Sequence, residues 1–256
     1  MTLDGRPLIF ISNDDGYDAK GINELITALR HIANIIVVAP DGPRSGSASA
    51  ITSDVPLRCC LLRQEYGLRI YKCNGTPADC VKLGLNSFVP RRPDIVIGGI
   101  NHGDNSSVNV HYSGTMGVVK EGCLKGIPSI GFSICSHNPE ADFSYCMPWV
   151  VKVVEKVLYK GLPQGICLNV NFPYVKELKG IKVCRQTVGD WAEEFVKRPH
   201  PRGGDYYWLV GEYNNHEPEA TDTDHWALDN GYAAITPTQI DMTAYSVMDK
   251  IRNWNL

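Results

Sequence analysis

The sequence lacks the positive charge of a protein that binds anionic polymers. Its 25 Lys and Arg residues against 28 Asp and Glu residues give a formal net charge of −3. Without an excess of positive charge there is no bulk field to hold a nucleic acid polymer or an anionic membrane surface. We therefore expect neither nucleic acid nor membrane among its partners, and a small molecule as its substrate.

The first residues lack the pattern of an export signal. The segment MTLDGRPLIF carries Asp4 and Pro7 and leads into an apolar run of only a few residues. Such a run is too short for a signal peptide or a membrane anchor. We therefore expect the protein to be cytoplasmic.

Cysteines are too few for a disulfide scaffold. Nine among 256 residues is well below the roughly 8–10% that marks a short secreted disulfide protein. Cys59 and Cys60 are adjacent, but no Cys-x-x-Cys pair and no Cys/His zinc spacing occurs. Reduced, mostly buried thiols are the expectation.

Several catalytic and nucleotide-binding motifs are also missing. No Gly-x-Gly-x-x-Gly follows the first apolar run, no Gly-Lys-Ser/Thr marks a phosphate-binding loop, and no Gly-x-Ser-x-Gly marks a nucleophilic serine. The seven histidines are scattered without metalloprotease spacing. His102 and His111 flank the candidate site described below and could assist there, but exposed loop histidines are usually only solvated, and we expect that of both.

What the sequence does contain is an alternation of buried strands with amphipathic helices. With 43% hydrophobic and 21% charged residues, the composition is that of a globular protein. Short apolar runs predict strands at residues 8–11, 35–39, 94–97, 129–132 and 166–170, and spacings of three and four predict helices at 22–32, 113–125 and 150–158. Such alternation predicts an α/β fold, a parallel sheet with helices on both faces in three layers.

The pattern changes near residue 180. Residues 206–210 and 232–235 predict β segments, and an acidic stretch of low hydrophobicity, residues 212–224, separates them. We expect a catalytic core at residues 1–178 and a C-terminal extension at 179–256. The extension should contain a β-hairpin, serve as a subunit contact and return to the core.

Polar residues follow the predicted strands where ligands bind in open parallel sheets. They are Asn13, Asp14 and Asp15 after the first strand, Asp41, Arg44, Ser45 and Ser47 after the second, and Asn101 and Asn105 after the strand at 94–97. Adjacent carboxylates with hydroxyl and amide oxygens suit Mg²⁺ or Mn²⁺. The alternative is that Asn-Asp-Asp-Gly is only a turn. Repulsion between neighbouring carboxylates, which a dication would remove, favours a metal site.

Two further segments predict the starts of helices. Ser113-Gly114-Thr115 opens a helix whose free N–H groups would suit a phosphate, although an ordinary Ser/Thr cap is the alternative. Thr76-Pro77-Ala78-Asp79 has the spacing of a capping box, which favours a structural role.

Five ordered blocks together resemble the SurE family of nucleotidases. The blocks are Ser12-Asn13-Asp14-Asp15-Gly16, Ala39-Pro40-Asp41 with Arg44-Ser45-Gly46, Gly75-Thr76-Pro77-Ala78-Asp79-Cys80, Gly98-Gly99-Ile100-Asn101 with Gly103 and Asn105, and Tyr112-Ser113-Gly114-Thr115. The resemblance extends through Tyr206-Tyr207-Trp208 to Ile235-Thr236-Pro237 and so covers nearly the whole chain.

This resemblance implies a metal-dependent phosphomonoesterase acting on nucleoside 5′- and 3′-monophosphates. It implies a Rossmann-like core and a swapped C-terminal extension that builds a homodimer or homotetramer. Its metal ligands correspond to Asp14, Asp15, Ser45 and Asn101, which would hold one Mg²⁺ or Mn²⁺ per subunit. The positions around the phosphate correspond to Asn13, Asn105, Ser113, Gly114 and Thr115.

The expected reaction is attack of an activated water on phosphorus, with Asp14, Asp15 and Asn13 as the catalytic residues. Either aspartate could act as the general base, and Ser113 and Thr115 would hold the remaining phosphoryl oxygens. A covalent aspartyl-phosphate is disfavoured because the Asp-x-Asp-x-Thr/Val spacing of aspartate-nucleophile phosphatases is absent. Two other functions stay open: a nucleotide- or cation-binding module without chemistry, and a metal phosphatase for a non-nucleotide ester.

Overall fold

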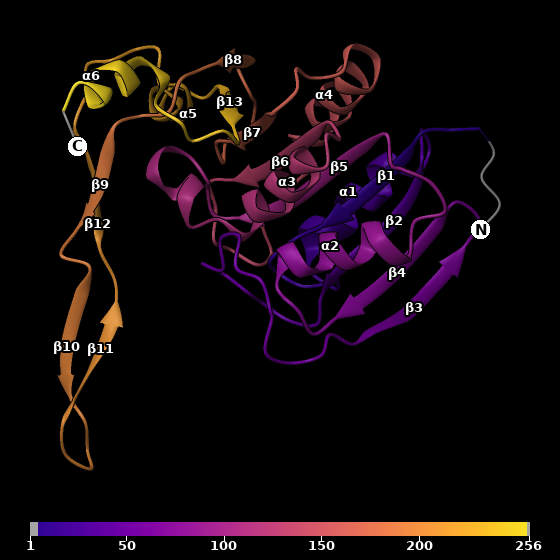
Figure 1. The fold of residues 1–256 in the computed structure, drawn as a ribbon, viewed down its shortest axis with the longest axis horizontal. Coiled ribbons are helices and arrows are strands. Elements are labelled where there is room, and N and C mark those ends of the chain that lie inside the picture. The colour runs from indigo at the N-terminus through magenta and orange to yellow at the C-terminus, as the bar shows by residue number, and fades with distance from the viewer. Residues whose placement is uncertain (1–4, 255–256) are drawn as a thin grey trace.

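A nine-stranded, mostly parallel sheet forms the centre of the molecule (Figure 1). The computed structural model describes residues 5–254. In sheet order the strands are β3 (Cys59–Glu65), β4 (Leu68–Cys73), β2 (Asn34–Pro40), β1 (Leu8–Ser12), β5 (Ile95–His102), β6 (Ser129–Ile134), β7 (Ile166–Phe172), β13 (Ala233–Gln239) and β8 (Ile181–Val183). The six strands from β4 to β7 run parallel to their neighbours, whereas β3 and β13 run antiparallel to β4 and β7.

Four helices cover the two faces of this sheet, which confirms the predicted three-layer α/β fold. Helices α1 (Lys20–Leu29) and α4 (Met147–Lys160) share one core with Ile9 and Ile11 of β1. Helix α2 (Pro77–Ser87) packs with α3 (Gly114–Leu124) on the other face, where Leu8 and Phe10 belong to a second core. Successive side chains of β1 thus enter different cores, so its run of apolar residues is continuous.

Helix α2 begins with the capping box that the sequence predicts. Thr76 Oγ1 accepts a hydrogen bond from Asp79 N at 3.1 Å, and Asp79 Oδ2 accepts one from Thr76 N at 2.9 Å. The Asp79 carboxylate also accepts from Thr52 N and Thr52 Oγ1 at 3.0 and 2.6 Å. Burial raises the pKa of Asp79, but the hydrogen bonds from Thr52 and Thr76 outweigh it and hold the pKa below its ordinary value. This segment is structural.

The polar stretch at residues 42–74 contains a hairpin, formed by β3 and β4 at one edge of the sheet. Strand β5 is longer than predicted and reaches His102, with an irregular register between Gly98 and Asn101. The prediction that Asn101 comes after this strand is therefore wrong. Its place is in the strand, just after an irregularity of the kind that redirects side chains.

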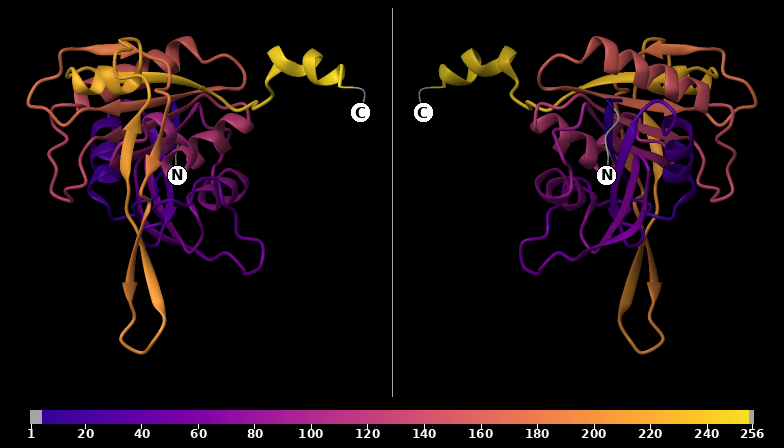
Figure 2. Two further views of the ribbon diagram at one scale, coloured as in Figure 1. Left: turned by 90° about the vertical axis from the view of Figure 1, so that its left-hand side faces the viewer. Right: turned by 90° about the vertical axis from the view of Figure 1, so that its right-hand side faces the viewer.

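The C-terminal extension contains two narrow ribbons and returns to the sheet. Strands β10 (Phe195–Pro199) and β11 (Asp205–Leu209) form an antiparallel hairpin, which confirms the β segment predicted at 206–210, and β9 (Gly189–Ala192) pairs with β12 (Glu212–Asn215). The hairpin projects far from the body of the molecule (Figure 2). The segment predicted at 232–235 is part of β13, inside the central sheet. The division at residue 178 stays a prediction.

Short helical segments complete the chain. They are η1 (Ser107–His111), α5 (Asp224–Asp229), η2 (Tyr245–Val247) and α6 (Met248–Arg252). A buried carboxylate, that of Asp224, joins the extension to η1: it accepts hydrogen bonds from Ser107 N at 2.9 Å, Thr187 N at 3.0 Å and His225 N at 2.9 Å. Within residues 5–254 no helix combines the length and apolarity needed to cross a bilayer.

Candidate active site

The turn after β1 places two neighbouring carboxylates at the carboxyl end of the central strand. Asp14 is 5% exposed, and the side chain of Asp15 is 20% exposed. Asn13 forms the turn itself: its Nδ2 donates to Gly16 O at 2.8 Å, and its Oδ1 accepts from Gly16 N at 3.2 Å. The alternative that this segment is only a turn therefore holds for Asn13. Contact of Asn13 with a substrate stays a prediction. The aspartates remain free to act as ligands.

The loop after β2 is fastened to this turn by its backbone. Arg44 N donates to Asp14 O at 2.7 Å. Ser45, which follows Arg44 in the chain, is therefore held close to this turn. Ser45 is exposed, whereas the hydroxyl of Ser47 is buried and makes no hydrogen bond within the described chain. A buried hydroxyl without a partner is uncommon, so Ser47 marks a place where a polar ligand fits.

The end of β5 reaches the same carboxylates. His102 N donates to Asp15 Oδ2 at 3.3 Å, and His102 Nδ1 lies 3.4 Å from the same oxygen. Asn101 Nδ2 donates to Gly103 O at 2.7 Å, so its Oδ1 is the oxygen left to act as a ligand. Three of the four predicted metal ligands thus belong to segments in direct contact with one another: Asp14, Asp15 and Asn101. Ser45 follows the residue that contacts Asp14.

The N-terminus of α3 faces Asp14. Ser113 caps the helix, with its Oγ accepting from Met116 N at 2.9 Å, and Thr115 Oγ1 donates to Asp14 Oδ1 at 2.5 Å. A Cβ atom on Gly114 would lie 2.7 Å from Asp14 Cβ and 2.8 Å from Ser47 Oγ, so only glycine allows this approach. The helix start and the carboxylate therefore lie in one place, but the Thr115 proton is committed to Asp14 rather than directed at an anion.

Asn105 lies in a buried amide network behind the site. Its Nδ2 donates to Ser133 Oγ at 2.7 Å, its N donates to Asn171 Oδ1 at 2.8 Å, and its carbonyl accepts from Asn169 Nδ2 at 2.7 Å. These contacts fix the loop between β5 and η1. Contact of Asn105 with a phosphate stays a prediction.

The electrostatics at Asp14 suit a cation. Burial, opposed by the hydrogen bond from Thr115 and assisted by the neighbouring charge of Asp15, raises the pKa of Asp14 to about 6. Among residues 5–254 no Lys or Arg forms an ion pair with either aspartate. A dication would compensate this buried negative charge. The donor set fits Mg²⁺ or Mn²⁺, since it consists of carboxylate, hydroxyl and amide oxygens.

Two residues at the site are more buried than sequence reasoning expected. The expectation that His102 is a solvated loop residue is wrong: its side chain is 14% exposed, lies against Asp15 and Phe143, and has a buried Nε2 without a partner. Ser47 is the other. Its position in a polar loop gave no signal of burial, because that burial depends on α3. His111, by contrast, is exposed as expected.

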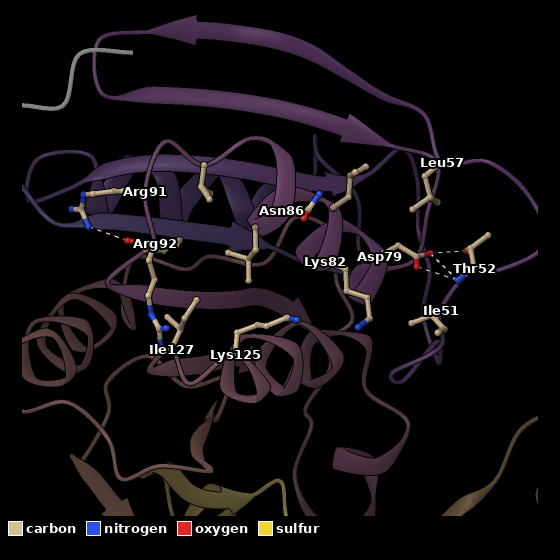
Figure 3. A pocket seen from close by; sticks show the side chains of 14 residues that line it. Ile51, Thr52, Leu57, Asp79, Lys82, Asn86, Arg91, Arg92, Lys125 and Ile127 are labelled. Atoms are coloured by element: carbon tan, nitrogen blue, oxygen red, sulfur yellow. Dashed lines mark hydrogen bonds between the residues drawn. The ribbon is translucent and has the colours of Figure 1, made fainter.

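A separate cavity lies on the α2 side of the molecule, with a volume of about 900 Å³ (Figure 3). Lys82, Arg91, Arg92 and Lys125 line it together with apolar side chains. Arg91 pairs with Asp94 at 2.8 Å. None of the predicted site residues lines this cavity, so volume alone does not locate the site.

Comparison with known proteins shows the family to which the chain belongs. The family model described as Survival protein SurE matches residues 9–193. The chain belongs to the SurE family. All the predicted ligands and phosphate-binding residues lie inside the matched range, which confirms the resemblance found from the five sequence blocks.

Relatives across the SurE family match nearly the whole chain. The protein named 5′-nucleotidase SurE from Phocaeicola vulgatus is 63% identical over 251 residues, 98% of each chain. The protein of the same name from Bacteroides fragilis is 57% identical over 251 residues, again 98% of each chain. The crystal structure of the SurE protein from Aquifex aeolicus has a TM-score of 0.84 at 38% identity and covers 98% of this chain and 100% of that one. The fold is therefore shared over nearly the whole chain.

Proposed function

We propose that this SurE-family chain is a nucleotidase that hydrolyses nucleoside 5′-monophosphates, and 3′-monophosphates as well, with one Mg²⁺ or Mn²⁺ per subunit. The names of the relatives support the nucleotidase activity. The observation that carries the proposal is the placement of two adjacent carboxylates, one of them 5% exposed, against the N-terminus of a helix. That arrangement offers ligands for a cation next to donors for an anion.

In this proposal Asp14, Asp15, Ser45 and Asn101 hold the cation. When bound, it would withdraw charge from a phosphoryl oxygen and lower the pKa of a nearby water. The hydrogen bond from Thr115 Oγ1 to Asp14 Oδ1 fixes the orientation of that carboxylate. Asp14 or Asp15 accepts the proton of the attacking water, and the Thr115 N–H at the start of α3 stabilises a phosphoryl oxygen. Asn13 fixes the turn that presents both aspartates.

The decisive experiment is Asp14→Asn, assayed by release of phosphate from nucleoside monophosphates in Mg²⁺ or Mn²⁺. We expect turnover to be lost while the circular dichroism spectrum and the melting temperature indicate a folded protein. Asp18→Asn is the matched control, because Asp18 is an exposed carboxylate in the same turn region. Wild-type turnover by Asp14→Asn would refute the ligand assignment, and full activity in excess chelator would refute the dependence on a cation.

Two rival functions are separated by substrate and turnover. A nucleotide- or cation-binding module would bind nucleoside monophosphates without releasing phosphate. A phosphatase for sugar phosphates or short polyphosphates would prefer those esters in a panel compared by kcat/KM. The nucleotidase proposal requires nucleoside monophosphates to be hydrolysed with the highest kcat/KM of the panel.

The C-terminal hairpin supports the proposal of a homodimer or homotetramer. Tyr207, Trp208 and Leu209 of β11 are 58%, 63% and 68% exposed on a hairpin that stands away from the body (Figure 2). Aromatic surface of this kind is typical of contacts between chains. We propose a second copy of this chain as its partner, and a cytoplasmic location for the assembly. Light scattering of the wild type and of Trp208→Ser tests the assembly, since a wild-type monomer at micromolar concentration would contradict it.

A further inference from the structure

Three cysteine side chains meet where β4 ends, away from the residues proposed for hydrolysis. Cys59 of β3 is the register partner of Cys73 of β4. Asn74 N donates to Arg58 O at 3.2 Å, which makes Cys59 and Cys73 a non-hydrogen-bonded pair of the antiparallel ladder. In such pairs the Cα atoms lie about 4.5 Å apart and the side chains are close. That spacing lies within the range of roughly 4.4–6.8 Å found for disulfides.

The surroundings of Cys73 favour a reactive sulfur. Its Sγ accepts a hydrogen bond from Gly75 N at 3.4 Å and lies within hydrogen-bonding reach of the thiols of Cys59 and Cys80. The hydrogen bonds from Cys59 and Cys80 lower the pKa of Cys73, more than its burial raises it. Cys73 is fully buried and Cys59 is half-buried, and the hydrogen bond to Cys73 raises the pKa of Cys59, so the negative charge of the pair lies on Cys73. Cys60, which is exposed, points to the opposite side of the strand.

We propose that Cys59 and Cys73 form an oxidisable dithiol site that takes a peroxide as its oxidant. The Cys73 thiolate attacks the peroxide, breaks its O–O bond and becomes a sulfenic acid, and the released hydroxide takes the proton of the Cys59 thiol and leaves as one water. The Cys59 thiolate then attacks the Cys73 sulfur, forms the S–S bond and displaces hydroxide, which leaves as a second water with the proton that Cys73 gave up on ionisation. Two thiols and one hydrogen peroxide thus give one disulfide and two waters.

The bond would act on the loop that carries Ser45 and Ser47. This loop, residues 41–58, starts where Asp41 N donates to Cys73 O at 2.7 Å and ends at Cys59, which faces the same Cys73. Both ends of the loop therefore meet at one residue. A disulfide between Cys59 and Cys73 would make the contact at the end of the loop covalent. Oxidation would therefore restrain residues 41–58 without modifying a residue of the proposed active site.

The test uses the full-length, reduced protein, treated with hydrogen peroxide in slight excess. We expect two of the nine thiols to be lost, a peptide linking Cys59 to Cys73 to be found by mass spectrometry, and both thiols to return with dithiothreitol. Cys60→Ser should respond in the same way as the wild type. Cys59→Ser, a change at a half-buried position that should fold, should lose no pair of thiols. A bond between other cysteines, or oxidation of Cys59 to a sulfinic acid alone, would overturn the site.

Limited trypsin digestion tests the effect on the loop. Cleavage after Arg58, an exposed residue at the loop's end, requires the start of β3 to open. We expect this cleavage to slow after oxidation of the wild type and to stay unchanged in Cys59→Ser. Equal cleavage rates in the oxidised and reduced wild type would overturn the restraint. Because both readouts are independent of catalysis, they stand whether or not the protein hydrolyses nucleotides.

Discussion

Replacing Gly117 by alanine should displace the loop that carries Ser45 and Ser47. Gly117 lies in α3, and a Cβ atom built on it would fall 2.0 Å from Ala48 O. Real Cβ contacts are essentially never shorter than 3.0 Å, so the loop backbone has to retreat by at least about 1 Å. Ala48 N also donates to Tyr112 O at 3.1 Å, and this hydrogen bond would be strained or lost.

The expected effect is large for activity and small for stability. A reacting group misplaced by about 1 Å can cost on the order of 100-fold in rate, so we expect kcat/KM to fall by about that factor. Overpacking costs roughly 1–3 kcal/mol, while alanine in place of glycine gains about 1 kcal/mol of helix propensity. The net loss of roughly 0–2 kcal/mol lowers the melting temperature by at most about 8 °C. The variant should therefore be folded at 25 °C.

Phosphate release and a melting curve are measured for Gly117→Ala beside two glycine controls. Gly42→Ala changes the same loop, where a Cβ meets no atom within 4 Å, and should have wild-type kcat/KM. Gly122→Ala is also in α3, but its Cβ would meet Ser129 Oγ at 2.4 Å on the sheet side. It should lower the melting temperature without lowering the kcat/KM of the folded protein. The reasoning is refuted if Gly117→Ala keeps wild-type kcat/KM, or if Gly122→Ala loses as much.

Three further predictions follow from buried hydrogen bonds. Asp79 has a pKa below its ordinary value, so its ionised form stabilises the fold above about pH 4, and this contribution is lost as the pH falls through the folded-state pKa. Asp79→Asn should lower the free energy of unfolding by about 2 kcal/mol at pH 7. Below pH ~5 the free energy of unfolding of the variant should depend less on pH than that of the wild type. Asp224→Ala leaves Ser107 N and other donors unpaired and should cost about 3 kcal/mol, with faster amide exchange in η1; unchanged exchange would contradict its role. Thr115→Val removes the donor to Asp14 and should lower kcat/KM roughly tenfold, whereas Thr115→Ser should retain it.

The fold was predictable where local pattern and burial agree. Strands β1 and β2 are buried on both faces at every position, so apart from Ser12 and Asn34 at their ends their sequences are apolar runs. The helix predicted at 113–125 is α3, with Ser113 and Lys125 as its caps. The position of β13 in the sheet was not predictable, because its partner β7 lies more than sixty residues earlier in the chain and no local signal records that pairing.

The candidate site was predictable at the level of segments and not of hydrogen bonds. Strand ends in a parallel sheet share one edge, which is why Asp14, Asp15 and Asn101 belong to segments in contact. The contact from Thr115 to Asp14 joins residues 101 positions apart and depends on one rotamer. The burial of His102 depends likewise on packing against Phe143. This hydrogen bond and this burial arise from tertiary structure, and composition and residue spacing do not predict them.

The antiparallel entry of β13 between β7 and β8 has a consequence for how the protein is made. The ribosome synthesises the chain from the N-terminus. The six parallel strands β4, β2, β1, β5, β6 and β7 can therefore associate before residues 233–239 emerge. Until then the backbone N–H and C=O groups along the outer side of β7 have no strand to pair with. The nascent protein therefore carries an open, mostly apolar sheet edge, Ile166–Phe172, through the synthesis of the whole extension. Premature termination before β13 should yield an aggregating product rather than a smaller enzyme.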